Sequence, residues 1–595
     1  MEPRANFKKS ISKEKLDYKK TCASIARYFT PYKSSFINLF IMMLIITAFE
    51  ALLPFISKAI IDVGIQKHDY TFLTIMLIAN VAIIISITIS DIARNWILLH
   101  VSSRINIALI SDYLVKLMKL PITFFETKMS GDILQRAYDH ERIRSFIMNN
   151  SLAVIFSSIT FVVFGLILLI YNKVVFLIFI VGNILYTVWI FAFLRIRKKI
   201  DWDFFEIESK NQTYWIETIG CIQDIKLNNY EKQKRWKWQT IQASLFKINF
   251  KLLKIDIIQN SGAQFIDQLK NLTITFFCAR AIITGEITFG IMISTQFIIG
   301  ILNGPVVQFI QFIITGQFAQ ISFLRLNEIH QLENEDINEE TASTELPNNK
   351  DLVFDNVVFK YSPHTTPVLK GIHLIIPEGK VTAIVGESGS GKSTLLKLLL
   401  RLYKPSSGQI LIGGIDVSKI NLSQWRDCCG SVMQDGKIFN ESILNNIVLN
   451  DERIDYKRLK YAVETANIAF EIEQFSQGYQ TIMGEQGRGL SGGQKQRILI
   501  ARALYKNPDF LIFDEATNSL DTINEQKIVS ALEHIFRNKT VIVVAHRLST
   551  IRKADQIVVM YEGIVTEIGN HQSLIKLKGR YYQMIQSQMD LVTIN

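Results

Sequence analysis

Residues Gly386–Thr394 read Gly-Glu-Ser-Gly-Ser-Gly-Lys-Ser-Thr, and they follow a short strand-like run, Val381–Val385. A leucine-rich segment of helical composition comes next. This order of strand, glycine-rich loop and helix is the context in which the pattern G-x-x-x-x-G-K-[ST] forms a phosphate-binding loop. Glycines let backbone N–H groups wrap phosphate oxygens, and the N-terminus of the helix adds positive potential. The stretch therefore predicts an α/β domain that binds a nucleotide.

The side chains of this loop indicate how the nucleotide is held. We expect the ammonium group of Lys392 to reach the β and γ phosphates of ATP, and the hydroxyl of Ser393 to coordinate Mg²⁺. The loop residues that we expect to bind ATP are Ser388, Gly389, Ser390, Gly391, Lys392, Ser393 and Thr394.

A second apolar run, Phe510–Phe513, ends in two acidic residues. Buried parallel strands deliver such residues at their carboxyl edge, beside the phosphate loop. We expect Asp514 to hold the Mg²⁺ shell and Glu515 to orient or polarise the attacking water, because phosphoryl transfer requires mainly positioning and charge stabilisation. The alternative is a surface acidic pair at a strand end.

Two more strand-like runs end in polar residues. His546 follows Val541–Val544 and is predicted to contact the γ-phosphate, although a lone His at a strand end is usually structural. Gln434 follows Ser431–Met433 and is predicted to join Mg²⁺ to the other half of the chain. The alternation of short strands with helical runs in this half predicts a largely parallel sheet.

The run Leu490–Gln494 reads Leu-Ser-Gly-Gly-Gln and lies about a hundred residues after the phosphate loop. We expect the hydroxyl of Ser491 and the backbone N–H of Gly493 to meet a phosphate. A chain that carries both this run and the loop is predicted to clamp ATP between two copies.

The first half of the chain has a different composition. Hydrophobic residues make up 49% of the 595 residues, yet 20% are charged, which fits a membrane domain joined to a soluble one. A membrane helix needs about 20 mostly apolar residues, and about six segments meet that length. They run near Phe36–Ile56, Phe72–Leu99, Leu152–Tyr171, Val174–Leu194, Ala263–Ile283 and Gly290–Ile314.

The formal net charge is +11, and the distribution of the basic residues indicates how these segments are oriented. Basic residues crowd the N-terminal tail and the segment Arg195–Lys199, beside apolar spans, which marks the cytoplasmic side of a membrane and argues against nucleic acid as the partner. Both ends of the chain are then predicted to lie in the cytosol. The long internal segments His100–Asn150 and Arg195–Lys254 are predicted to extend the membrane helices into the cytosol, because they contain few helix breakers.

The fifth candidate span has one polar face. Asn260, Gln264, Asp267 and Asn271 recur at spacings of four, three and four, and Asp267 lies three residues from Lys270. Ionisable groups within spans usually face a water-filled cavity. We interpret Gln264, Asp267 and Asn271 as lining a translocation path, with Gln296, Asn303 and Gln308 of the sixth span. The alternatives are a polar seam between two subunits and a position below the bilayer.

Together these motifs resemble the ATPase domain of ABC transporters, and the whole chain resembles an exporter-type half-transporter. The resemblance implies that Tyr361 stacks on adenine, that Gln434 is the Q-loop glutamine and that His546 is the switch histidine. It makes Ser519–Asp521 the D-loop, and it implies that Leu490–Gln494 closes over ATP held by the other subunit.

The resemblance also assigns coupling helices, which dock the membrane domain on the ATPase domains. One contains Phe124 and Phe125, after Pro121, and the other lies near Trp215–Cys221. From the residues alone, Phe124 and Phe125 are equally explained by packing against the protein's own helices. The expected organisation is a tail over residues 1–34, a membrane domain of six helices over 35–330, a linker over 331–350 and an α/β ATPase domain over 351–588.

The resemblance implies ATP-driven export by alternating access from the bacterial cytoplasmic membrane. Lys392, Ser491, Glu515 and His546 are all present, so a homodimer is favoured over a heterodimer with a degenerate partner. Met433–Phe439 and Asp224–Asn228 resemble bacterial peptide and bacteriocin exporters, which favours a peptide substrate. Those relatives usually begin with a cysteine protease domain, and only about 35 residues precede the first span here. Lipid or hydrophobic drug efflux is the alternative, whereas apolar spans exclude a soluble ABC ATPase and their fusion to the ATPase domain argues against an importer.

Overall fold

The computed structural model describes residues 30–128, 130–336, 346–449, 453–484, 487, 489–515, 539–545 and 551–593. The chain forms two compact units. The first consists of residues up to Leu120 together with Phe124–Glu333, and the second of Pro121–Thr123 together with the chain from Asn334 onward.

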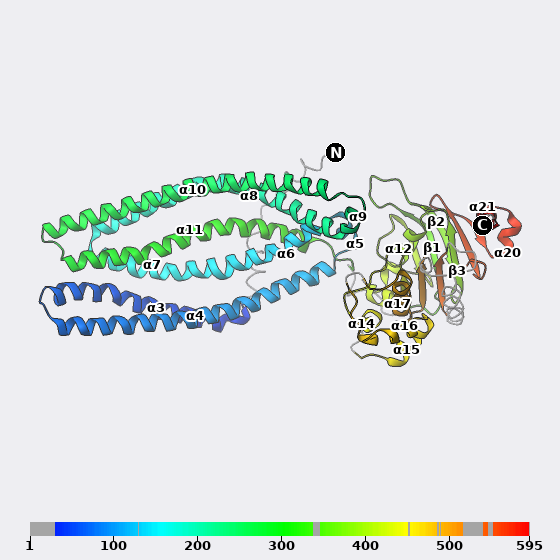
Figure 1. Ribbon diagram of the computed structural model, residues 1–595, viewed down its shortest axis with the longest axis horizontal. Helices are drawn as coiled ribbons and strands as arrows, with labels where there is room; N and C mark the ends of the chain where they lie inside the picture. Colours follow the sequence, from blue (N-terminus) through cyan, green and yellow to red (C-terminus); the bar gives the residue numbers. More distant parts are fainter. Residues whose placement is uncertain are drawn as a thin grey trace. The chain divides into compact units, whose positions relative to one another are not determined.

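The first unit is helical, and its long helices run side by side (Figure 1). Its long helices are α3 (Lys33–Ala59), α4 (Tyr70–Met118), α7 (Leu152–Tyr171), α8 (Lys173–Gly220), α10 (Glu231–Ile283) and α11 (Phe289–Gln331). Shorter segments are the π-helical turns η2 (Ile60–Ile65) and η3 (Phe146–Ser151), and the helices α6 (Ser130–Ser145) and α9 (Ile222–Leu227). Each predicted span lies within one helix, and most helices continue well beyond the apolar run, as predicted.

Among the described residues, five helical segments are long and apolar enough to cross a membrane. The helix α10, which contains the predicted fifth span, is not among them. Its polar residues lower its mean hydropathy, and several of them pack against other helices of the unit rather than face an apolar solvent.

The turns between long helices are short and capped by side chains. A single residue, Asn172, separates α7 from α8, and its side chain accepts hydrogen bonds from the backbone N–H groups of Val174 and Val175. Asp69 caps α4 in the same way through Phe72. Such caps satisfy N–H groups that a helix start leaves without partners.

Glycines bring α8 and α10 close together. A Cβ on Gly182 would lie 2.6 Å from Cγ of Lys270, and a Cβ on Gly262 would overlap the indole ring of Trp189. The indole N–H of Trp189 donates to the backbone carbonyl of Gln259 at 3.1 Å. The two helices therefore form one tightly packed pair.

The second unit contains two sheets. The six-stranded sheet has the order β10-β9-β3-β8-β7-β6, and its strands are β3 (Val381–Gly386), β6 (Cys429–Val432), β7 (Phe510–Asp514), β8 (Thr540–Val544), β9 (Gln556–Tyr561) and β10 (Ile564–Gly569). All pairs in it are parallel except β9 with β10. The smaller sheet is antiparallel, with the order β2-β1-β4-β5, and its strands are β1 (Leu352–Phe359), β2 (Leu369–Ile376), β4 (Ser407–Ile412) and β5 (Ile415–Asp416).

Helices that contact the strands of this unit include α12 (Lys392–Leu399), α13 (Leu422–Asp427), α17 (Gly492–Tyr505) and α20 (His571–Leu577). The helices α14 (Ile443–Val448) and α15 (Tyr456–Thr465) pack on α17, α16 (Ala469–Gln474) packs on α15, and α21 (Arg580–Thr593) packs on α20. Trp425 of α13 is fully buried and donates from its indole N–H to the carbonyl of Leu399. Strands β3, β6, β7 and β8 end at one edge of the sheet because they run parallel, and the predicted α/β architecture is confirmed.

Candidate functional site

The loop after β3 is shaped for close approach of its backbone. A Cβ on Gly386 would overlap the carbonyl oxygen of Met560, and Gly391 has a φ of 100°, which a residue with a side chain rarely adopts. Gly391 is the N-cap of α12, so the helix begins directly at Lys392. The expected strand, loop and helix context is present.

Lys392 lies inside this loop. Its Nζ donates to the carbonyl oxygens of Gly386 and Glu387, both at 2.9 Å. Burial lowers the pKa of its ammonium group, and the nearby Glu515 and Asp514 carboxylates act in the opposite direction. The present partners of this buried cation are neutral carbonyls, so an anionic ligand would stabilise it.

The hydroxyl of Ser390 supplies a test of whether a phosphate fits this loop. Ser390 is 3% exposed, and its Oγ has no hydrogen-bond partner in the described part of the chain. Buried polar atoms usually have partners, because an unmet hydrogen bond costs about 1–3 kcal/mol. The orphaned hydroxyl therefore fits a loop that is completed by phosphate oxygens.

Ser393 and Asp514 form the predicted metal-binding pair. The hydroxyl of Ser393 donates to Oδ1 of Asp514 at 3.1 Å, which joins the start of α12 to the end of β7. Asp514 is 1% exposed. Burial is the main cause that raises the pKa of its carboxyl, while the Ser393 hydrogen bond lowers it. A hydroxyl beside a buried carboxylate matches the oxygen ligands that Mg²⁺ prefers.

Glu515 follows directly and is held in an unusual backbone conformation. Its φ is 54°, in the left-handed region that few residues other than glycine occupy. Its Oε2 accepts a hydrogen bond from Nε2 of Gln434 at 3.0 Å. The structure therefore brings the ends of β6 and β7 together, as the sequence predicted. Strained residues of this kind gather at active sites.

Gln496 on α17 is a neighbour of this site that sequence reasoning missed. Its Nε2 donates to the backbone carbonyl of Glu515 at 3.5 Å. The signal available in the sequence was its position two residues after Gln494, which places it one turn into the helix that begins at Gly492. Gln496 connects the Leu490–Gln494 run to the acidic edge.

Tyr361 lies half exposed beside the loop. Its hydroxyl is 3.0 Å from the hydroxyl of Thr394, and its ring makes edge contacts with Phe359 and Tyr403. An exposed aromatic face next to a phosphate loop is suited to stacking on a base, and its role with adenine stays a prediction.

The Leu490–Gln494 run forms the beginning of α17. Ser491 is the N-cap, and its hydroxyl accepts from the N–H of Gln494 while the Gln494 side chain accepts from the N–H of Ser491. Gly492 and Gly493 follow in the first turn, where helix N–H groups point outward. Ser491 is exposed, so this helix start is accessible to an anion.

Some predicted residues fall outside the described part of the chain. These are His546 and the Ser519–Asp521 run. The strand that leads to His546, β8, ends at the same edge as β3 and β7.

The polar face of α10 meets two other helices. Lys270 is 5% exposed, and its Nζ donates to Asp267 Oδ1 at 2.7 Å, Asn303 Oδ1 of α11 at 3.0 Å and Asn183 Oδ1 of α8 at 3.4 Å. Asn271 donates to the other carboxylate oxygen of Asp267. The predicted Asp267–Lys270 pair is present, and it lies in a seam between helices. Asn183 was missed, and its signal was a lone Asn in an apolar run.

The remaining members of that face behave differently. Asn260 and Gln264 are exposed, whereas Gln259 is buried. Exposure of Gln264 is compatible with a path-lining role, which stays a prediction. The pair and the seam are observed within one chain, and the two alternatives, a polar seam between two subunits and a position below the bilayer, stay open.

Phe124 and Phe125 pack within the first unit. Phe124 is buried against Tyr113, Leu326 and Ile329, and Phe125 lies against the same cluster. Their neighbour Ile122 instead packs against the buried cluster of the second unit, to which Pro121–Thr123 belong. The two Phe side chains thus pack against the protein's own helices, as the alternative explanation expected. Any coupling role they have stays a prediction.

A helical membrane domain followed by a phosphate-loop ATPase domain, with an accessible helix start at Ser491, defines an ATP-driven membrane transporter. Family models agree with this reading. Residues 36–306 match the ABC transporter transmembrane region and residues 369–518 match the ABC transporter ATPase domain.

Individual relatives extend over nearly the whole chain. The exotoxin translocation ATP-binding protein PaxB of Pasteurella aerogenes is 32% identical over 94% of this chain and 78% of its own length. The alpha-hemolysin translocation ATP-binding protein HlyB of Escherichia coli is 32% identical over 94% and 79%. A solved bacterial Atm1-family ABC exporter with ATP bound has a TM-score of 0.86 and 26% identity, and covers 94% of this chain and 98% of its own. The chain belongs to the ABC transporter family, as an ATP-driven exporter whose membrane and ATPase domains are fused.

Proposed function

We propose that this protein exports a polypeptide out of the bacterial cytosol as a homodimer, using ATP and Mg²⁺. The observation that carries the proposal is the similarity over 94% of the chain to PaxB, whose name describes exotoxin translocation. HlyB and a leukotoxin export ATP-binding protein, LtxB of Aggregatibacter actinomycetemcomitans, have names of the same kind. These names support a polypeptide cargo over a lipid or a drug.

The ATPase residues support a shared hydrolytic step. The phosphate loop holds the β and γ phosphates of ATP through backbone N–H groups, Ser390 and Lys392. Ser393, Asp514 and Gln434 would hold Mg²⁺, which would neutralise phosphate charge when bound. Glu515 accepts a hydrogen bond from the attacking water and aligns it with the γ-phosphate.

The exposed start of α17 supports a dimer. Ser491 and the N–H groups of Gly492 and Gly493 face outward, and they would contact the γ-phosphate of an ATP held by the second copy. ATP then binds the closed dimer better than the open one, and this differential affinity drives closure. Because the chain carries its own Lys392, Ser491 and Glu515, two identical copies suffice for two complete sites.

The charge pattern supports an orientation in the membrane. Counting α10 and α11 as one membrane crossing each, the chain crosses twice between the basic segment Arg195–Lys199 and the ATPase domain. Both are then on the same side of the membrane. With ATP in the cytosol, both chain ends are then cytosolic, and the connections at Asn172 and Thr284–Thr288 are external.

The test is ATPase stimulation of the protein reconstituted in liposomes. Added polypeptides are expected to raise the ATPase rate above that of the protein without additions, and lipids and hydrophobic drugs are compared in parallel. Stimulation by hydrophobic drugs or lipids with no response to polypeptides would instead support the alternative cargo. Cross-linking of a Ser491→Cys variant to a Ser388→Cys partner copy tests the dimer separately.

A further inference from the structure

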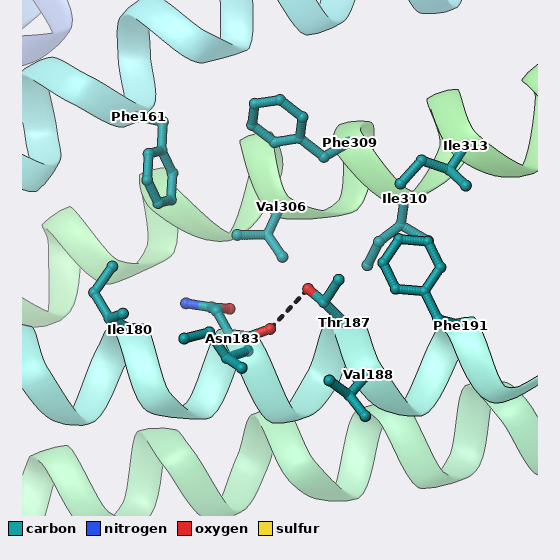
Figure 2. Close-up of a pocket in the computed structure, with 11 residues that line it drawn as sticks. Phe161, Ile180, Asn183, Thr187, Val188, Phe191, Val306, Phe309, Ile310 and Ile313 are labelled. Atoms are coloured by element: carbon teal, nitrogen blue, oxygen red, sulfur yellow. Dashed lines mark hydrogen bonds between the residues drawn. The ribbon is translucent and has the colours of Figure 1, made fainter.

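A groove lies between α8 and α11 in the membrane domain. It has a volume of about 370 Å³, and Phe161 of α7 closes one end. Side chains of α8 face those of α11 across the space (Figure 2). The volume is within the range of about 300–1,000 Å³ that is usual for small-molecule sites. The residues from α8 and α11 that matter most here are Ile184, Val188, Phe191, Val306 and Ile310.

The walls of the groove are almost entirely apolar. Of the described residues that line it, Asn183 and Thr187 are the polar ones, and both already make hydrogen bonds within the protein. Thr187 donates to the carbonyl of Asn183 at 2.8 Å, as Figure 2 shows. The amide of Asn183 donates to the carbonyl of Phe179, and its oxygen accepts from Lys270. A polypeptide segment would bring more backbone N–H and C=O groups than these two side chains can satisfy, which is costly in an apolar setting. A hydrocarbon chain brings none.

The same face of α8 becomes basic directly after the groove. Helical residues four and seven apart share a face, so Arg195 and Lys198 follow Phe191 along it. At 1.5 Å per residue, they lie about 6 and about 10 Å beyond Phe191. The apolar run of α8 ends at Leu194, which puts both cations at headgroup level.

These two cations are available to a ligand. Arg195 and Lys198 are exposed, and neither has an ion pair or hydrogen bond in the described part of the chain. Arg197 pairs with Asp256 of α10 at 2.8 Å, and its guanidinium lies over the ring of Phe318 of α11. Arg195 and Lys198 have no such contacts in the described part of the chain, and the adjacent Lys199 is exposed as well.

We propose that the groove between α8 and α11 binds an anionic phospholipid of the cytosolic leaflet. One acyl chain lies against Val188 and Val306, and the phosphate lies between Arg195 and Lys198. Basic pockets between membrane helices on the cytoplasmic side bind anionic headgroups. The leaflet rests on the orientation proposed above, whereas the site itself does not depend on the exported cargo.

The test is native mass spectrometry of the full-length protein, purified in detergent, delipidated and titrated without ATP. The probes are phosphatidylglycerol and phosphatidylcholine with the same acyl chains. We expect one phosphatidylglycerol to be retained preferentially. The double variant R195Q/K198Q is expected to weaken its binding by about thirtyfold, from the attraction of two basic residues near a membrane surface. Lys173→Gln is the matched control, because Lys173 lies on the same face of α8 at its other end.

A second variant tests the acyl chain separately. Val188→Trp fills the groove and is expected to weaken retention of both lipids, while the elution volume and ATP binding of the protein report that it remains folded. Unchanged retention in this variant, or equal retention of the two lipids by the wild type, would overturn the proposal. Displacement of the lipid by millimolar inorganic phosphate, or equally tight binding of dihexanoyl-phosphatidylglycerol, would overturn it in favour of a free phosphate site. Because the assay contains no cargo, failure of the polypeptide proposal leaves its result unchanged.

Discussion

Gln434 donates a hydrogen bond to the carboxylate of Glu515 across 3.0 Å. The bond connects the loop after β6 with the end of β7, and it occupies one oxygen of the residue that is expected to align water. The contact places the amide that is predicted to join Mg²⁺ beside the carboxylate that is predicted to align water. We expect nucleotide binding to change this contact.

Glu515→Gln is expected to preserve ATP affinity and lower ATP hydrolysis by about a hundredfold or more. An amide has the same shape as the carboxylate but cannot accept a proton from the attacking water. Equilibrium binding of labelled ATP and the rate of phosphate release check the two parts. Gln434→Glu is the complementary variant, because it places a second carboxylate beside that of Glu515. A Glu515→Gln protein that hydrolyses ATP at the wild-type rate would show that another residue aligns the water.

Asp514→Asn is expected to abolish Mg²⁺-dependent ATP binding and yet raise the melting temperature of the nucleotide-free protein. Burial raises the pKa of Asp514, so its contribution to stability is fully present below the ordinary aspartate pKa. That contribution is lost as the pH rises through the folded-state pKa, because the buried carboxyl must then ionise. The difference in melting temperature between Asp514→Asn and the wild type should therefore be larger at neutral pH than at acid pH.

The control for that comparison is Asp435→Asn, which changes an exposed carboxylate in the same unit. It should leave the pH dependence of melting as in the wild type. A stability gain of Asp514→Asn that is constant with pH would contradict ionisation as the cause.

Ser491→Ala is expected to lower ATP hydrolysis more than tenfold while costing about 1 kcal/mol of stability, the usual loss for an N-cap. Ser442→Ala is the matched control, since Ser442 caps α14 through Asn445 at 3.1 Å and lies in a different segment. Both variants should melt at similar temperatures, and only the first should lose activity. Equal losses of activity in the two variants would show that Ser491 acts only as a helix cap.

Lys270→Met is expected to destabilise the membrane domain by about 3–5 kcal/mol, because it leaves the Asp267 carboxylate without its cation in the seam. The double variant Lys270→Met with Asp267→Asn should recover most of that loss. Thermal melts in detergent measure the stability, and cargo-stimulated ATPase measures transport coupling. Recovered stability with lost stimulation would assign the seam to the translocation path, and recovery of both would assign it to packing.

Asp62→Ala is expected to separate η2, which follows α3, from the beginning of α11. The Asp62 carboxylate accepts from the hydroxyl of Thr288 at 2.7 Å and from the N–H of Gly290 at 3.0 Å. A Cβ on Gly290 would lie 2.5 Å from Oδ1 of Asp62, so the contact depends on glycine there. Faster labelling of a cysteine at Ile287, which is partly buried, would report the separation. Asp69→Ala, which removes only the local cap of α4, should not change that rate.

The sequence was most informative where a chemical motif coincides with an element boundary. The phosphate loop, Asp514, Glu515 and the α17 start each combine a required residue type with a strand or helix end, so their positions were predictable. Asn183 and Gln496 were not predicted, because each acts through a contact between segments far apart in the chain. The Phe124–Phe125 pair illustrates the same limit, since an exposed socket and an internal packing cluster demand the same apolar residues.

The single-residue turn at Asn172 constrains how the membrane domain moves. A one-residue link whose side chain is bonded to the next helix prevents α7 and α8 from sliding along one another like pistons. Any relative motion of these two helices near the turn is then a rotation about Asn172, and the displacement that a rotation produces grows with distance from it. A rotation of given size would therefore move the far end of α8, 48 residues long, more than it moves the residues beside the turn.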